Sequence, residues 1–169
     1  MDFRKQLAGE LPYLRRFARA VSGDAALADD LVQDCVERAM VKSHLYDPAR
    51  PLRAWLFAVL RNIYISGLRR TSRSGIVKTV DDLVDGEDAV PPAQEERLAV
   101  SSITEALDRL GPQHREVIVL VALEEMSYRD VAEILGVPLG TVMSRLSRAR
   151  ESLRQILEAR GHTGLRRVK

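Results

Sequence analysis

The chain has 169 residues, 46% hydrophobic and 30% charged, a composition typical of one globular domain or of two small ones. It has no apolar run near the roughly 18 residues that a membrane span requires, and its start lacks the apolar core of a signal peptide, so we expect a cytoplasmic protein. The net charge of +2 divides into +5 over residues 1–73, −6 over residues 74–96 and +3 over residues 97–169.

Three helices are predicted in the N-terminal part. Apolar residues recur in steps of three and four over residues 2–21, where we expect Pro12 to kink the helix or to start a second one. Asp24 can cap the next helix, which runs to about Val41. Its inward side is predicted to hold Leu27, Leu31, Val32, Cys35 and Val36. A loop with two prolines precedes a third, strongly apolar helix over residues 52–70.

Residues 71–96 combine glycine, adjacent prolines and a run of acids, which indicates a linker. A loop of this length is uncommon inside a compact domain. Four more helices are predicted, over residues 98–110, 113–123, 127–135 and 139–159. We therefore expect an all-α protein with two small helical domains on a flexible acidic linker. The expected bounds are 1–73 for the first domain, 74–96 for the linker, 97–160 for the second domain and 161–169 for a basic tail.

The last two predicted helices have the signature of a helix-turn-helix. Ser127 and Asp130 fit a capping box, Gly136 suits the left-handed end of a short helix, and Pro138 prevents its continuation. Val142 and Leu146, four residues apart, are expected to face back toward that short helix. The outward side of the second helix would then lie in the major groove of duplex DNA. It carries Thr141, Ser144, Arg145, Ser147 and Arg148, with Arg150 and Arg154 farther along, where phosphate contacts are favoured.

Three stretches together resemble an extracytoplasmic-function (group IV) sigma factor of bacterial RNA polymerase. ADDLVQDCVERA resembles the core-binding helix of sigma domain 2, and RAWLFAVLRNIYISGLRR resembles its promoter-melting and −10 recognition helix. LGPQHREVIVLVALEEMSYRDVAEILGVPLGTVMSRLSRARESLR resembles sigma domain 4, the reader of the −35 element. The resemblance covers nearly the whole chain and implies two partners, core RNA polymerase and promoter DNA.

The resemblance also implies roles for individual residues. Core polymerase would dock on the polar face formed by Asp30, Gln33, Asp34 and Glu37. The unpaired −10 strand would be read by Arg61, Asn62 and Ser66, with phosphate contacts from Arg69, Arg70 and Arg73. The loop 44–53 would form a pocket for a flipped base, where Tyr46 either stacks on the base or packs within the loop. The −35 element would be read by Thr141, Ser144, Arg145, Ser147, Arg148 and Arg150. An anti-sigma factor is a further implied partner.

Other classes of protein fit the sequence less well. A response regulator of the LuxR type shares the helix-turn-helix but would need an upstream domain with strands, and residues 1–70 show no alternation of strands and helices. An enzyme would need a catalytic constellation, whereas His44, His114 and His162 are scattered and Cys35 lies alone. A helical interaction module explains the amphipathic helices but not the basic SRLSRAR face. We therefore expect no catalytic residue, no metal and no cofactor.

Overall fold

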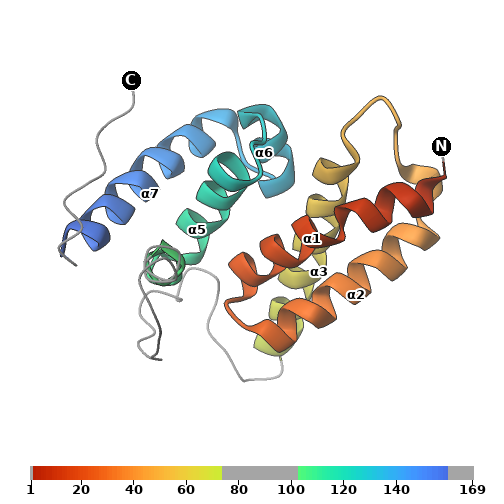
Figure 1. Ribbon diagram of the computed structural model, residues 1–169, viewed down its shortest axis with the longest axis horizontal. Helices are drawn as coiled ribbons and strands as arrows, with labels where there is room; N and C mark the ends of the chain where they lie inside the picture. Colours follow the sequence, from red (N-terminus) through yellow and green to blue (C-terminus); the bar gives the residue numbers. More distant parts are fainter. Residues whose placement is uncertain (1, 74–102, 160–169) are drawn as a thin grey trace.

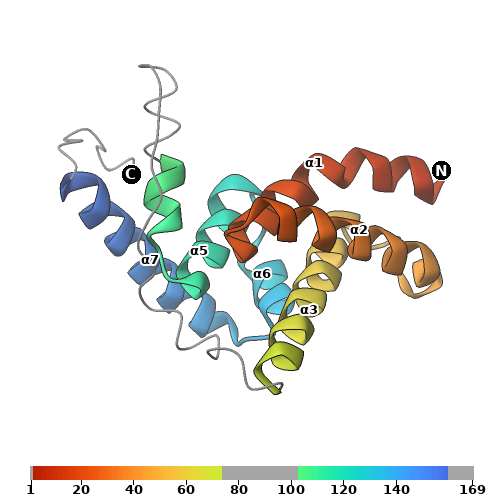
Figure 2. The same cartoon turned by 90° about the horizontal axis from the view of Figure 1, so that it is seen from below.

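The structure, a computed structural model, describes residues 2–73 and 103–159, and within these ranges it contains helices and no strand. Helices α1 to α3 form an N-terminal domain, and helices α5 to α7 belong to a C-terminal domain (Figure 1). In both views, α5 and α6 lie between α7 and the N-terminal domain (Figure 2). The predicted linker and tail lie outside the described residues, as do Arg160 and residues 97–102 of the second predicted domain.

Helix α1 spans Phe3–Ser22, close to the prediction. The Asp2 side chain accepts a hydrogen bond from the backbone N–H of Arg4 (3.1 Å), and Gly23 ends the helix in the left-handed conformation with φ 68°. Pro12 lies inside this single helix. The alternative that a second helix starts at Pro12 is therefore wrong.

Helix α2 spans Ala25–Val41, and the predicted cap is confirmed, because the Asp24 side chain accepts from the N–H of Leu27 at 2.7 Å. One inward prediction is wrong, since Leu27 is 41% exposed. The buried face follows steps of three and four through Ala28, Leu31, Val32, Cys35 and Ala39. Leu27 lies one position away from that face, which is about 100° of helical rotation. Val36 is half-buried.

A short 3₁₀ helix, η1 (Ser43–Leu45), leads through the proline-containing loop to α3, which spans Leu52–Arg73. Leu56, Phe57, Leu60 and Ile63 form the buried side of this apolar helix. Trp55 is half-buried, and its ring packs against Tyr46 at a centroid distance of 5.5 Å.

In the C-terminal domain, residues 103–108 are helical, and α5 spans Pro112–Ile118. The helix predicted over residues 113–123 changes to a π-helical segment, η2 (Val119–Leu123), before it ends. Such segments are rare and occur mostly as single turns inside helices, often at functional sites. Helix α6 spans Tyr128–Leu135 and α7 spans Leu139–Ala159, as predicted.

Buried apolar side chains of both domains form one connected cluster. In the N-terminal domain, the rings of Phe17 and Phe57 pack with centroids 4.6 Å apart. The two domains meet where α3 packs on α6 and α1 packs on α5. Among the described helices, none is long and apolar enough to cross a membrane.

Candidate nucleic-acid interface

Helices α6 and α7 form the predicted helix-turn-helix. The hydroxyl of Ser127 accepts from the N–H of Asp130 (3.1 Å) and donates to the Asp130 carboxylate (2.6 Å), which closes the first turn of α6. Gly136 has φ 65°, and its N–H and that of Val137 bond back into α6, which fixes the sharp turn before α7. Val142 and Leu146 of α7 are buried, as predicted from their spacing.

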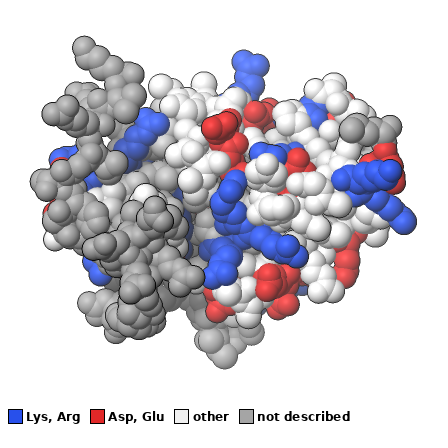
Figure 3. All heavy atoms as spheres, in the orientation of Figure 1, with Lys and Arg blue, Asp and Glu red and all other residues white. Residues whose placement is uncertain are grey.

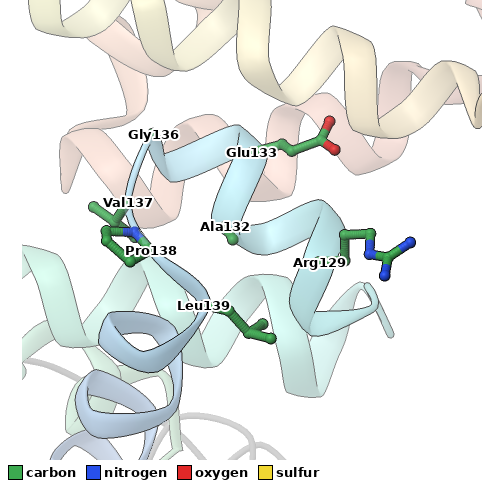
Figure 4. Close-up of a pocket in the computed structure, with 7 residues that line it drawn as sticks. All are labelled: Arg129, Ala132, Glu133, Gly136, Val137, Pro138 and Leu139. Atoms are coloured by element: carbon green, nitrogen blue, oxygen red, sulfur yellow. The ribbon is translucent and has the colours of Figure 1, made fainter.

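A shallow hollow lies beside this turn (Figure 4). Ala132, Val137, Pro138 and Leu139 give it an apolar floor, and Leu139 is 49% exposed. Arg129 and Glu133, four residues apart, extend from α6 to the same side of that helix. The hollow thus separates the start of α7 from a charged edge of α6.

The outward side of α7 presents most of the predicted −35 residues to solvent. Ser144, Ser147, Arg148 and Arg150 are exposed, and Thr141 is half-exposed. Arg145 differs, because it is half-buried and lies near α5, where its charge acts on His114 and Glu116. Burial lowers the pKa of His114, and the positive charges of Arg148 and Arg145 lower it further. One predicted base-reading residue therefore faces the domain interior more than its neighbours do.

The predicted −10 surface lies on α3. Asn62, Ser66, Arg69 and Arg70 are exposed along this helix, whereas Arg61 is half-buried. The Nε atom of Arg61 donates to both carboxylate oxygens of Glu116 on α5, at 3.3 and 3.4 Å. Burial raises the pKa of Glu116, although Arg61 and Arg145 act in the opposite direction. The structure therefore places Arg61 at the contact between the two domains. The side chain of Arg73 lies outside the described residues.

The loop before α3 is held by its own residues and by α6. The Tyr46 hydroxyl donates to the carbonyl of Arg50 (2.8 Å), and the Tyr46 ring packs on Phe3 and Trp55. Arg50 forms an ion pair with Glu133 of α6. Of the two predicted roles for Tyr46, the structure contains the packing within the loop.

The predicted polymerase-binding residues share one exposed face of α2. Asp30, Gln33, Asp34 and Glu37 are all exposed, and the Gln33 side-chain amide donates to Glu37 at 3.2 Å. We call these four residues the acidic face. Figure 3 shows acidic and basic side chains interleaved on the side of the molecule that it presents, rather than one continuous field of either sign.

Two functional candidates were missed in the sequence, Glu116 and Glu124. Both are buried, at 5% and 4% exposure, and both contact arginines of the N-terminal domain. The available signal was a glutamate at each end of the apolar run 117–123. The spacing of apolar residues within one segment does not indicate that another domain buries these two glutamates.

The C-terminal domain contains a helix-turn-helix with a basic outward side, and the N-terminal domain carries the exposed acidic face of α2. Together they define a two-domain protein of the DNA-binding class. Residues 7–61 match the family model described as the sigma2 domain of PhyR, and residues 101–153 match sigma-70 region 4. The chain belongs to the ECF family of RNA polymerase sigma factors, as its relatives show. It is 37% identical over 160 residues to the ECF RNA polymerase sigma factor EcfG of Rhodopseudomonas palustris (strain TIE-1), covering 95% of this chain and 87% of EcfG.

A second relative is the ECF RNA polymerase sigma factor SigL of Mycobacterium tuberculosis (strain H37Rv), 37% identical over 151 residues, covering 89% of this chain and 85% of SigL. Among solved structures, the chain resembles the sigma factor RpoE in complex with the anti-sigma factor NepR from Bartonella quintana. That match has 38% identity and a TM-score of 0.77, and it covers 93% of this chain and 97% of RpoE. It also resembles CnrH in complex with the cytosolic domain of CnrY, with 30% identity, a TM-score of 0.65 and coverage of 93% and 88%.

Proposed function

We propose that this chain is an alternative sigma factor that binds core RNA polymerase, recognises −35 and −10 promoter elements and starts transcription. The observation that carries the proposal is the exposed polar and basic side of α7, in a helix-turn-helix that matches sigma-70 region 4. Nucleotidyl transfer belongs to the polymerase, and this chain contributes binding and positioning alone. Its place of action is the cytoplasm, where its polymerase works. The functional units are residues 1–73 and 97–160, with residues 74–96 as the tether and residues 161–169 as a basic tail.

In this proposal, α7 reads the −35 duplex. Arg148 donates two hydrogen bonds to a guanine edge, Ser144 and Ser147 contact neighbouring bases, and Thr141 and Arg150 contact phosphates. Arg145, half-buried beside α5, contributes at the edge of the groove. A good bidentate arginine contact is worth about 1–3 kcal/mol of discrimination, which corresponds to a change in affinity of roughly 5- to 150-fold.

Run-off transcription with reconstituted holoenzyme tests this assignment. Start sites mapped on a genomic library of the source organism define the −35 and −10 elements. We expect Arg148→Ala to reduce transcription from those promoters at least fivefold. Arg109→Ala is the matched control, since Arg109 is an exposed arginine of the same domain that lies outside the helix-turn-helix. Transcription at the wild-type rate by Arg148→Ala contradicts the −35 assignment.

The −10 strand would be read by Arg61, Asn62 and Ser66 once its bases are unstacked, with Arg69 and Arg70 on the phosphates. Capturing a flipped base offsets an unstacking cost of a few kcal/mol. Asn62→Ala should therefore slow initiation on duplex promoters. On templates whose −10 region is already mismatched, its initiation rate should return to the wild-type value. An equal defect on both templates contradicts a role in strand capture.

The acidic face would dock on a basic helical surface of core polymerase. Exposed carboxylates act through salt-sensitive attraction, so Asp34→Asn should weaken core binding and reduce its dependence on salt. Asp108→Asn, an equal change at an exposed position of the C-terminal domain, is the control. Equal core affinity of the two variants contradicts the docking assignment.

We also propose control by an anti-sigma factor. RpoE, at 38% identity, has been solved in complex with the anti-sigma factor NepR, and CnrH, at 30% identity, in complex with the cytosolic domain of CnrY. The test adds a NepR-like protein of the source organism to the run-off assay. Inhibition that excess chain relieves supports the proposal, and transcription unaffected at saturating inhibitor contradicts it for that protein.

A further inference from the structure

Beside the apolar cluster that joins the two domains, their contact contains two buried carboxylates of the C-terminal domain. Glu116 lies on α5, and Glu124 follows directly after the π-helical segment η2. Their side chains are 6% and 0% exposed. Each is paired with arginine from the N-terminal domain, so both carboxylates cross the boundary that joins the two halves of the protein.

Glu124 is held by helices α1 and α3 together. Its Oε1 atom lies 2.5 Å from Nε of Arg16, and its Oε2 atom lies 3.9 Å from Nη1 of Arg53. Oε2 is buried without a hydrogen-bond partner. Glu124 therefore enters a cationic recess whose second arginine stands slightly beyond hydrogen-bond distance.

Burial of a carboxylate is costly unless an opposite charge compensates it. If the domains stood apart, both glutamates would be hydrated and would need no partner. In the closed arrangement they depend on Arg16, Arg53 and Arg61. A buried ion pair adds little net stability relative to the two hydrated charges, but loss of one partner leaves the other buried and unpaired. Removing the two carboxylates should therefore shift the protein toward separated domains.

Closure has unequal consequences for the two proposed binding surfaces of the N-terminal domain. The acidic face on α2 is exposed. Arg61 on α3 is instead occupied by Glu116, and its side chain is 16% exposed. Because its Nε–H is donated to Glu116 and most of its side chain is buried, Arg61 offers a nucleic-acid strand fewer donors and less surface than a free arginine does. The closed protein thus leaves the polymerase surface open and covers one residue of the −10 surface.

We propose that Glu116 and Glu124 form an autoinhibitory latch, which holds the C-terminal domain against the N-terminal domain and keeps Arg61 from the −10 strand until the domains separate. The latch consists of the contacts of Glu116 and Glu124 with arginines of the N-terminal domain, which are present in the structure. Its effect on DNA rests on the proposed function, through the role of Arg61.

The test uses the full chain and measures the distance between the domains by energy transfer. One fluorophore is attached at Val41→Cys, at the end of α2, and the other at Glu158→Cys, near the end of α7; Cys35 is buried. The latch variant is Glu116→Gln with Glu124→Gln, which keeps side-chain shape and removes both charges. The matched control is Glu125→Gln, the exposed neighbour of Glu124. We expect the distance to increase in the latch variant and to stay at the wild-type value in the control.

Exchanging the charges of Arg61 and Glu116 distinguishes loss of their ion pair from a general effect of the substitutions on folding. Glu116→Arg alone should open the protein, and Arg61→Glu combined with Glu116→Arg should restore the closed distance. Wild-type distances in both the latch variant and Glu116→Arg would overturn the latch, regardless of what Arg61 does on DNA.

The second readout is the affinity of the free chain for a single-stranded oligonucleotide carrying the −10 region mapped by run-off transcription. We expect the Glu116→Gln, Glu124→Gln protein to bind it at least threefold more tightly than wild type or Glu125→Gln. An increased distance with unchanged affinity would overturn the autoinhibitory effect. Failure of the −10 assignment is recognised separately, as wild-type transcription by holoenzyme containing Arg61→Ala.

Discussion

The guanidinium carbon of Arg53 lies 3.3 Å from the centroid of the Tyr13 ring, so an arginine of α3 stacks on an aromatic ring of α1. The same guanidinium pairs with Glu10, with 2.6 Å between Nε and Oε2. Its other edge lies 3.9 Å from Glu124 of the C-terminal domain. Arg53 thus joins two helices of its own domain and orients a charge toward the other domain.

Replacing Arg53 should destabilise the protein. Arg53→Ala removes a cation–π contact and an ion pair, and we expect the free energy of unfolding to fall by about 2 kcal/mol. Arg53→Lys should cost about half as much, because an ammonium group keeps the charge but not the flat stacking surface. Urea denaturation measures both, with Arg15→Ala at an exposed position of α1 as the control. Equal stability of Arg53→Ala and the control would show that the stack contributes nothing.

The turn of the helix-turn-helix gives a second prediction, based on the backbone. Gly136 has φ 65° and open space where a Cβ atom would lie, so Gly136→Ala should cost about 1 kcal/mol from backbone strain alone. Gly140, in the first turn of α7, also has open space and no positive φ. Gly140→Ala should therefore stabilise the protein by about 0.5–1 kcal/mol. Thermal unfolding of the two variants should show shifts of opposite sign, and shifts of the same sign would contradict the backbone argument.

The N-cap of α6 makes a separate prediction. Ser127→Ala removes the acceptor for the Asp130 N–H, and loss of such a cap costs about 1 kcal/mol. Ser147→Ala, at an exposed position inside α7, removes no cap and should leave the unfolding free energy nearly unchanged. Urea denaturation compares the two. If Ser127→Ala is as stable as the control, water replaces the Ser127 hydroxyl as acceptor for the Asp130 N–H without loss of stability, which would contradict the prediction.

Local chemistry explains what could be predicted from the sequence. Asp24, Ser127 and Gly136 act on backbone within four residues of themselves, so their roles follow from neighbouring letters alone. Helix positions followed from apolar spacing for the same reason. The inward position predicted for Leu27 was wrong because Leu27 lies next to the buried face of α2. An apolar residue at such a position fits the spacing of three and four as well as a residue on the buried face does.

Contacts between the domains could not be predicted in this way. Arg61 and Glu116 are 55 positions apart, and Arg16 and Glu124 are 108 positions apart. Nothing in either local pattern identifies the partner, because the pairing depends on how α3 and α1 pack on the C-terminal helices. The half-buried position of Arg145 has the same origin, since its neighbours on α5 are set by tertiary packing rather than by the pattern of α7.

Cys35 should be chemically inert in the folded protein. It is fully buried, its Sγ atom donates to the carbonyl of Leu56 (3.5 Å), and burial raises its pKa to about 12. A thiol without thiolate character does not react with disulfide reagents. We expect no reaction with Ellman's reagent at pH 8 in buffer and one equivalent in urea. Val41→Cys, at a position 76% exposed, should react at once and serves as the positive control.

The same burial predicts a loss of stability in alkali. The unfolded thiol releases its proton near its ordinary pKa of 9, whereas the folded thiol keeps it until about pH 12. The contribution of Cys35 to the free energy of unfolding is therefore complete below pH 9 and is lost as the pH rises from about 9 to about 12. Cys35→Ala should show a shallower decline than wild type over this range in urea denaturation. Parallel declines would contradict the assignment.

His114 should make promoter binding depend on pH. Burial and the charges of Arg148 and Arg145 lower its pKa in the free protein. Phosphates that approach these arginines neutralise the positive field, so the pKa of His114 rises when DNA binds, and binding takes up protons. Affinity should then increase as the pH falls through the pKa of the bound state, by about threefold between pH 7.5 and pH 5.5.

Fluorescence anisotropy of holoenzyme on a mapped promoter measures this effect as a difference between variants, since the polymerase also titrates. His114→Gln should lose the additional pH dependence, because glutamine keeps a polar side chain without a titrating proton. Asp108→Asn, at an exposed position of the C-terminal domain with no proposed role on DNA, should keep it. If His114→Gln and wild type follow the same pH profile, the positive field around His114 does not change when DNA binds. In that case Arg148 and Arg145 are not neutralised by the promoter, and the −35 assignment would lose support together with the pH effect.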